Sequence, residues 1–230
     1  MNDKVLITQS NYIPWKGYFD NINAVDTMVI YDDMQYTKRD WRNRNLIKTS
    51  NGLKWLSIPV NVKGKYDQKI NEVEINNPDW KINHWNQLYQ NYKNSQCFNE
   101  MELELKSLYL NNSETKLSNL NQLFIEKINS ILGIKTKILR SEDFKLKGDK
   151  TEKLVNICLE LGAKEYFTGP AAKNYIQESL FIKNSIKVKY FDYANYPEYN
   201  QLFGEFEHGV SILDLLFNTG KNTSFFMKTF

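Results

Sequence analysis

The chain has 230 residues, of which 41% are hydrophobic and 25% charged, and its formal net charge is +3. This composition is ordinary for a folded protein, and the length predicts one domain, residues 1–230, that buries a core without disulfides or metals. The small net charge argues against a large nucleic-acid footprint, and no apolar run approaches the length of a membrane span. Because the N-terminus lacks an apolar signal segment, we expect a cytoplasmic protein.

The first thirty or so residues predict a strand, a loop, a helix and a second strand. Val5–Ile7 is a short apolar run typical of a buried strand, and Pro14 keeps the residue before it out of helical geometry. Residues 15–24 have apolar side chains at helical spacing, and Thr27–Tyr31 is a second apolar run. This order indicates an α/β fold with a Rossmann-like or nucleotidylyltransferase-like start.

The middle of the chain predicts two more strands and then a helical insertion. Trp55–Val60 and Ile70–Ile75 are the strand candidates, and the second is expected at a sheet edge. Asn77 followed by proline marks a helix start, and Gly133 marks a helix end. Between these marks we expect helices at residues 78–94, 98–110 and 116–132.

Strands alternate with helices in the C-terminal part of the chain. Asp149 and Glu152 form a capping-box pattern at the start of a helix that ends at Gly162. Such alternation predicts a mainly parallel sheet with helices on both faces. The expected elements are strands at 136–139, 166–168 and 187–191 and helices at 149–162, 169–181 and 211–217.

Polar residues that follow the strands are candidates for a binding site, because parallel sheets bind ligands beyond the carboxyl ends of their strands. The topology brings together the loop Gln9–Tyr18, the segment Asp32–Gln35, the residues after Thr168 and the loop Asp192–Tyr199. We therefore expect a ligand site at this edge of the sheet.

The segment from Tyr36 to Lys54 is strongly basic, with six lysines and arginines and one aspartate. Arginine forks bind phosphate oxygens in pairs, so Arg42 and Arg44 are candidates for holding a pyrophosphate. A solvated basic loop explains the same charges equally well.

Candidate general bases are scarce. The chain has two histidines, His84 and His208. His84 is expected on a helix between Trp80 and Trp85, where packing is the simpler explanation, whereas His208 follows Glu207 in a loop. Histidine suits proton transfer because it titrates near neutrality. Residue spacing yields no metal-ligand cluster and no Ser-His-Asp or Cys-His set, and it identifies no cofactor.

Several long motifs, spread over nearly the whole chain, carry a family resemblance. They are Gln9–Asp20, Val29–Gln35, Asp40–Asn45, Trp55–Val60, Leu161–Ala163, Tyr166–Gly169, Tyr196–Gln201 and Ser211–Gly220. These motifs resemble the WbqC-like family of bacterial surface-polysaccharide biosynthesis proteins, although this chain has Ser10 where the family usually has proline. A weaker likeness is to nucleotidylyltransferase-like proteins, whose His-x-Gly-His motif is replaced here by Trp15–Tyr18, which keeps only the glycine.

The WbqC-like resemblance implies a place in O-antigen or capsule biosynthesis. We expect a transferase that moves an acyl or aminoacyl group, for example glycyl, from a donor to the amino group of a nucleotide-linked amino sugar. The alternative is a non-catalytic nucleotide-sugar-binding partner of such enzymes, and the nucleic-acid possibility is a charged tRNA that serves as donor. The expected catalytic residues are His208, His84, Asp32 and Asp33. The expected substrate-binding residues are Gln9, Asn11, Tyr12, Trp15, Tyr18, Gln35, Trp41, Arg42, Asn43, Arg44, Gly169, Asp214 and Asn218.

Overall fold

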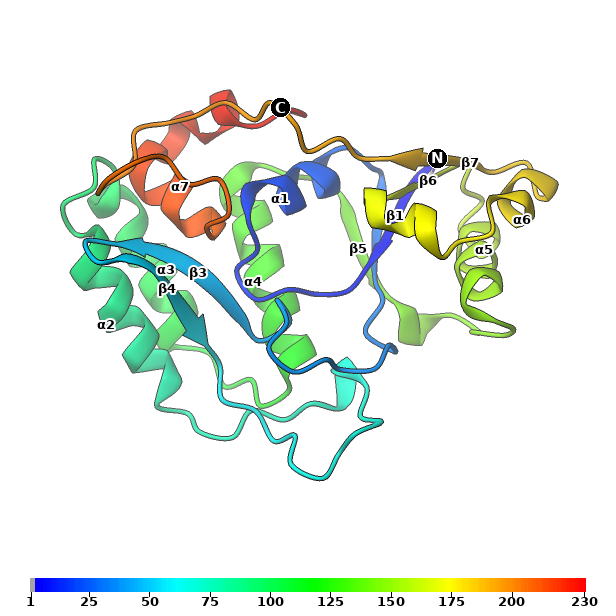
Figure 1. Cartoon of the computed structure of the whole chain (residues 1–230), viewed down its shortest axis with the longest axis horizontal. Coiled ribbons are helices and arrows are strands. Elements are labelled where there is room, and N and C mark those ends of the chain that lie inside the picture. Colours follow the sequence, from blue (N-terminus) through cyan, green and yellow to red (C-terminus); the bar gives the residue numbers. More distant parts are fainter. Residues whose placement is uncertain (1–2) are drawn as a thin grey trace.

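A five-stranded parallel sheet runs through the protein in a computed structural model that describes residues 3–230 (Figure 1). The strand order is β5-β2-β1-β6-β7, and every neighbouring pair is parallel. This α/β fold with a parallel sheet confirms the predicted fold class. The strands are β1 (Lys4–Thr8), β2 (Thr27–Ile30), β5 (Lys137–Arg140), β6 (Glu165–Thr168) and β7 (Lys187–Tyr190).

Helices cover both faces of the sheet, because successive side chains of each strand point to opposite faces. Leu6 of β1 packs into a core with α1 (Lys16–Asn23) and α4 (Leu117–Leu132). Val5 and Ile7 pack into a second core with α5 (Lys150–Glu160) and α6 (Glu178–Lys183). The sheet is therefore buried on both sides, as the apolar strand sequences predict.

The strand order reverses between β1 and β6. The chain adds strands outward from β1 in one direction through β2 and β5, and then in the other through β6 and β7. Such a reversal separates the loops at the carboxyl ends of the two central strands and opens a crevice for a ligand. The order is the one found in doubly wound nucleotide-binding folds, and it is consistent with the predicted Rossmann-like start.

A hairpin and three further helices form the other part of the molecule (Figure 1). Strands β3 (Arg44–Thr49) and β4 (Gly52–Ser57) pair antiparallel and form a separate two-stranded sheet. The hairpin and its helices share the first core with α1 and α4. The helices are α2 (Trp80–Tyr92), α3 (Phe98–Leu110) and α7 (Ile212–Thr219), and the short 3₁₀ helices are Ile70–Glu72, Ser141–Asp143, Pro170–Asn174 and Gly220–Phe226.

Of the two strands expected in the middle of the chain, one is confirmed in part and the other is wrong. The run from Trp55 lies in β4, which forms a hairpin with β3 because the turn at Ser50 and Asn51 folds β4 back onto β3. Gly52 has φ +96°, the left-handed geometry that an Asn-Gly turn favours. The expected edge strand at 70–75 is a 3₁₀ turn, whose start is capped by the Glu72 carboxylate accepting from the Lys69 amide at 2.9 Å.

The helix boundaries follow their capping signals closely. The Asp149 carboxylate accepts hydrogen bonds from the amides of Thr151 and Glu152, and Glu152 accepts from the Asp149 amide, so the predicted capping box is confirmed. Gly133 ends α4 in the left-handed conformation with φ 75°. The expected single helix at 169–181 is instead a 3₁₀ turn followed by α6.

Candidate functional site

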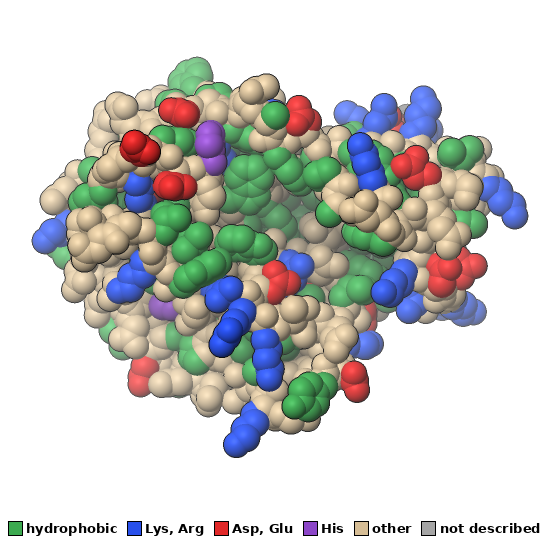
Figure 2. Space-filling view, in the orientation of Figure 1, with side chains coloured by type: hydrophobic (Ala, Val, Ile, Leu, Met, Phe, Trp, Pro, Cys, Tyr) green, Lys and Arg blue, Asp and Glu red, His purple; other side chains and the backbone are tan. Residues whose placement is uncertain are grey.

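A continuous cleft crosses the carboxyl ends of β1 and β6, where the strand order reverses. It has three parts that share lining residues, and we name them the α5 chamber, the throat and the Trp chamber, of about 490, 220 and 470 Å³. The α5 chamber shares Thr8, Gln9, Thr168 and Gly169 with the throat. Figure 2 shows a hollow near the middle of this face, with hydrophobic side chains along its walls. The cleft thus consists of two larger chambers joined by a smaller middle part.

The throat carries the positive charge of Arg42. One guanidinium nitrogen donates to Asn11 Oδ1, and another donates to Gln9 Oε1 at 3.1 Å. These partners are neutral, and the Asp40 carboxylate is 3.8 Å away at the edge of ion-pair distance. The guanidinium is therefore oriented by amides and keeps most of its charge available to a ligand.

The loop between β1 and α1 has a strained backbone. Ile13 is fully buried and has φ 38°, a conformation that a β-branched residue rarely adopts. Asn45 of β3 holds it there by donating to the carbonyl oxygens of Tyr12 and Ile13 at 3.1 and 2.9 Å. Strain that the surrounding structure maintains is typical of functional loops.

Trp15 forms a wall between the throat and the Trp chamber. Its ring lies against Gly17, where an added Cβ would come within 2.3 Å of the ring. The ring also makes edge contacts with Tyr193 and Tyr196, at centroid distances of 5.4 and 5.3 Å. The glycine in the Trp15–Tyr18 motif therefore places a tryptophan, and Trp41 and Tyr193 line the same chamber.

His208 lies on an exposed loop and lines the Trp chamber. Two buried lysines hold the chain between β7 and α7 in place through hydrogen bonds. Lys16 of α1 donates to the Pro197 carbonyl at 2.6 Å, and Lys48 of β3 donates to Gln201 Oε1 at 3.0 Å. Burial lowers the pKa of Lys16 to about 8, while Asp20 and Glu198 oppose the shift. The chain from β7 to α7 is therefore tied across the ends of α1 and β3.

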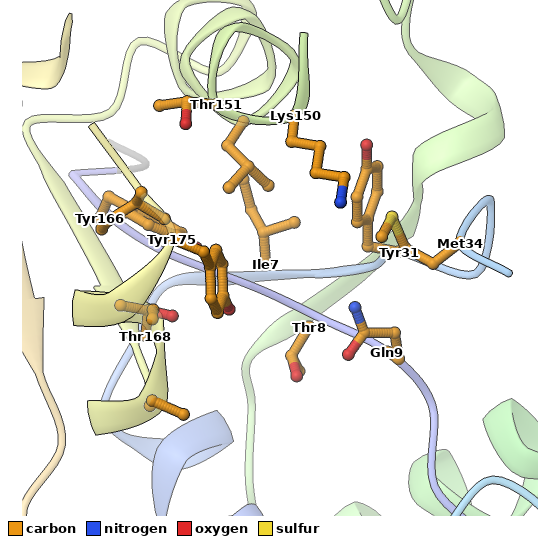
Figure 3. Close-up of a pocket in the computed structure, with 15 residues that line it drawn as sticks. Ile7, Thr8, Gln9, Tyr31, Met34, Lys150, Thr151, Tyr166, Thr168 and Tyr175 are labelled. Carbon is orange, nitrogen blue, oxygen red and sulfur yellow. The ribbon is translucent and has the colours of Figure 1, made fainter. Parts of the chain in front are cut away.

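The α5 chamber lies on the other side of the throat and is shown in Figure 3. Tyr31 and Tyr175 flank it, Ile7 lies between them, and the ammonium of Lys150 points toward Gln9. Sequence reasoning missed most of this chamber. The signals in the sequence were the polar residue Thr168 at the end of a strand and Lys150 at the start of the helix capped by Asp149.

Eight of the expected site residues line the cleft. They come from the loop after β1, helix α1, the segment before β3, the end of β6 and the loop before α7. They are Gln9, Asn11, Trp15, Tyr18, Trp41, Arg42, Gly169 and His208.

Tyr12 and His84 form a buried pair away from the cleft. The Tyr12 hydroxyl is 2.8 Å from His84 Nδ1 and 2.8 Å from the Tyr109 hydroxyl. Burial lowers the pKa of His84 to about 4, opposed by a hydrogen bond with the Ser57 backbone. The imidazole is therefore neutral at physiological pH and joins α2 to the loop after β1. His84 also lines a separate hollow beside β4.

The two carboxylates after β2 are already engaged by protein groups. Asp32 is buried, and it accepts from the Ser10 amide and hydroxyl at 2.9 and 2.6 Å and from the Ser118 hydroxyl. Asp33 pairs with Lys69 at 3.2 Å and accepts from Ser141 at 2.6 Å. Asp32 thus positions the loop after β1, and neither carboxylate lines the cleft.

The other expected residues also lie outside the cleft lining. Asp214 is fully buried and accepts from the hydroxyls of Tyr92 and Tyr199 at 2.8 Å each, and burial is the main cause that raises its pKa. Asn218 donates to Asp214, which is one turn earlier on α7. Gln35 donates to the Tyr66 carbonyl and Asn43 donates to the Ile58 carbonyl.

Arg44 also points away from the throat. Its guanidinium carbon lies 4.0 Å from the centroid of the Trp55 ring, and it donates to the Arg39 carbonyl. Among residues 3–230, no group of three or more His, Cys, Asp or Glu side chains is placed to hold a metal ion.

The WbqC-like protein family model matches residues 9–225, which include the loop after β1, Arg42 and the loop that carries His208. The chain is 52% identical over 217 residues to the uncharacterized protein Rv1507c of Mycobacterium tuberculosis strain ATCC 25618 / H37Rv, and the match covers 94% of each chain. No solved structure matches the chain. Within the described residues, none of the helices combines the length and the apolar character needed to span a bilayer. The chain therefore belongs to the WbqC-like protein family.

Proposed function

We propose that this protein is a transferase that acylates or aminoacylates the amino group of a nucleotide-linked amino sugar in O-antigen or capsule biosynthesis. The observation that carries the proposal is the shape of the cleft, with two wide chambers joined by a throat that holds the guanidinium of Arg42. A nucleotide sugar has matching parts, because a narrow anionic diphosphate joins a nucleoside to a sugar ring. Membership of the WbqC-like family supports the polysaccharide setting.

The Trp chamber suits the sugar end of this ligand. Trp15 and Trp41 offer ring faces, and sugar rings pack their C–H faces on such apolar surfaces. His208 lines the same chamber and supplies an imidazole for the amine. No Asp or Glu among residues 3–230 lines any part of the cleft, so His208 is the one titratable base there apart from tyrosines and the Lys150 ammonium.

The proposed reaction forms one amide bond. The sugar amine attacks the carbonyl carbon of an activated acyl ester or thioester, the bond from that carbon to the leaving oxygen or sulfur breaks, and His208 accepts the proton that the amine loses. His208 passes this proton to the leaving oxygen or sulfur as it departs, which returns the imidazole to its neutral form. This direct transfer requires no covalent enzyme intermediate.

The test is mass spectrometry of nucleotide-linked amino sugars after incubation with the protein and acyl or aminoacyl donors, including a charged tRNA. The expected product is heavier than the amino sugar by the acyl group. His208→Asn should lower the rate by roughly a hundredfold, as the loss of a general base does, while the melting temperature stays near that of the wild type. Binding of the nucleotide sugar without product from any donor would favour the non-catalytic partner, which the sparse set of bases in the cleft also permits.

A further inference from the structure

The α5 chamber has no part in the amino-sugar chemistry, yet it is as large as the Trp chamber. Its volume of about 490 Å³ lies within the range of small-molecule sites. It opens into the throat beside Gly169. There is free space at this glycine, because a Cβ added to it would lie 3.4 Å from its nearest neighbour, the Tyr193 hydroxyl. A ligand that fills the Trp chamber and the throat therefore has a direct route into this second chamber.

The reaction proposed above decides which end of the ligand lies in which chamber. The amine must be near His208, so the sugar occupies the Trp chamber and the opposite end of the molecule extends through the throat. That end meets the sheet beyond the carboxyl ends of β1 and β6, at the reversal of strand order. Open α/β sheets bind nucleotides at this position.

The walls of the α5 chamber fit a nucleoside. Tyr31 and Tyr175 flank the space, and flat aromatic groups of this kind hold a base through its π-face (Figure 3). Ile7 and Leu154 supply an apolar floor. Thr168 is almost fully buried, and its side chain faces the chamber, where a hydroxyl can bond a ribose or a base edge (Figure 3).

Two cations lie on either side of Gln9. Arg42 reaches it from the throat, with Nη2 donating to Gln9 Oε1 at 3.1 Å. Lys150 reaches toward it from the α5 chamber (Figure 3). No carboxylate within residues 3–230 forms an ion pair with Lys150. A diphosphate that crosses Gln9 would meet both positive charges.

From these observations we propose that the α5 chamber binds the nucleoside of the nucleotide sugar, and that Lys150 and Arg42 bracket its diphosphate across Gln9. The proposal rests on the proposed function, since His208 fixes the orientation of the ligand.

The experiment is titration calorimetry of the full chain with UDP, GDP, ADP, CDP, dTDP and inorganic pyrophosphate. At least one nucleoside diphosphate should bind about tenfold or more tightly than pyrophosphate, because the base adds stacking. Ala171→Trp fills the chamber from its exposed rim and should weaken that nucleotide at least about tenfold while pyrophosphate binding stays unchanged. Asn174→Trp adds the same bulk to the same 3₁₀ turn outside the chamber and should bind like the wild type.

Two further variants keep the result clear if the added tryptophan disturbs the turn. Tyr175→Ala removes an exposed wall and should weaken the nucleotide at least about fivefold without affecting pyrophosphate. Lys150→Ala should weaken both ligands about tenfold or more, because it removes a charge that faces the phosphates.

The outcomes separate this proposal from the proposed function. If the wild type binds a nucleoside diphosphate and Arg42→Ala weakens it, but Ala171→Trp and Tyr175→Ala bind normally, the nucleoside lies elsewhere and this inference is overturned, while the proposed function stands. Equal affinity for pyrophosphate and every nucleoside diphosphate also overturns it. If neither nucleoside diphosphates nor nucleotide amino sugars bind, both proposals fail.

Discussion

Replacing Arg42 by alanine tests the role of the throat, and Arg44→Ala is its matched control. The two arginines are two residues apart in the same segment, but Arg42 lines the throat while Arg44 stacks on Trp55 outside the cleft lining. If the cleft binds a diphosphate through Arg42, only Arg42→Ala should weaken the binding of a nucleotide sugar. If general basic charge attracts the ligand, the two variants should behave alike.

The size of the effect follows from the surroundings of Arg42. Its side chain is 17% exposed, and it donates to two neutral amide oxygens, so a phosphate would gain a charge-assisted hydrogen bond in a partly desolvated place. Such a bond contributes about 1.5–3 kcal/mol, which corresponds to roughly a 10- to 150-fold change in Kd. The Asp40 carboxylate, 3.8 Å from the guanidinium, partly offsets its charge and moves the expected value toward the lower end.

Titration calorimetry with a nucleotide amino sugar measures this difference directly. Arg42→Lys should recover part of the loss, because lysine keeps the charge but not the planar fork. Arg44→Ala should change the affinity by less than about twofold, within the range of surface substitutions. Equal small effects for Arg42→Ala and Arg44→Ala would refute the reasoning, provided that thermal melting shows both variants folded.

Two further predictions concern residues that support the cleft. The pKa of His84 is lowered to about 4 from 6.5, so below pH 6.5 the unfolded chain binds a proton that the folded chain does not, and stability falls as the pH drops toward 4. Urea unfolding at pH 7 and 4.5 should show about 2–3 kcal/mol more loss in the wild type than in His84→Asn, and an identical loss would contradict the burial of His84. Gly17→Ala places a methyl group 2.3 Å from the Trp15 ring, so the ring should be displaced. The tryptophan fluorescence should change, and nucleotide-sugar binding should weaken by about 1 kcal/mol. Unchanged fluorescence and affinity would exclude this packing role of Gly17.

Local signals predicted the elements that local forces determine. The capping box at Asp149 and the apolar runs of β1 and β2 each depend on a few neighbouring residues, and the structure has them at the expected places. The hairpin of β3 and β4 also has a local signal, the Asn51-Gly52 turn, but the basic charges around Arg42 and Arg44 favoured a loop interpretation. The turn chemistry outweighs those charges, because Lys54 stays exposed in the hairpin and the buried Lys48 donates a hydrogen bond to Gln201.

The members of the candidate site could be predicted only in part, because side-chain direction depends on contacts between distant segments. Tyr12 and Trp15 are in one loop and both are aromatic, yet Tyr12 is fully buried against His84 while Trp15 lines the cleft. The turn at Ile13 that separates them is held by Asn45 of β3. No spacing rule within the loop contains that information, since the hydrogen-bond donor comes from a hairpin far along the chain.

Contacts between distant segments also bear on whether the cleft performs chemistry or only binds a ligand. Asp32 accepts hydrogen bonds from Ser10 and Ser118. These bonds fix the start of the loop that carries Asn11 and Trp15. A carboxylate used in this way supports binding by keeping the throat in shape, and it does not face an amine. In the proposed transferase, proton transfer in the Trp chamber would depend on His208. Lys16 and Lys48 hold its loop in place, and its ring lies edge-on to Phe206 at a centroid distance of 4.6 Å. These contacts agree with the proposed transferase, which needs a base held within reach of the sugar, whereas the binding-partner alternative assigns the imidazole no chemical role.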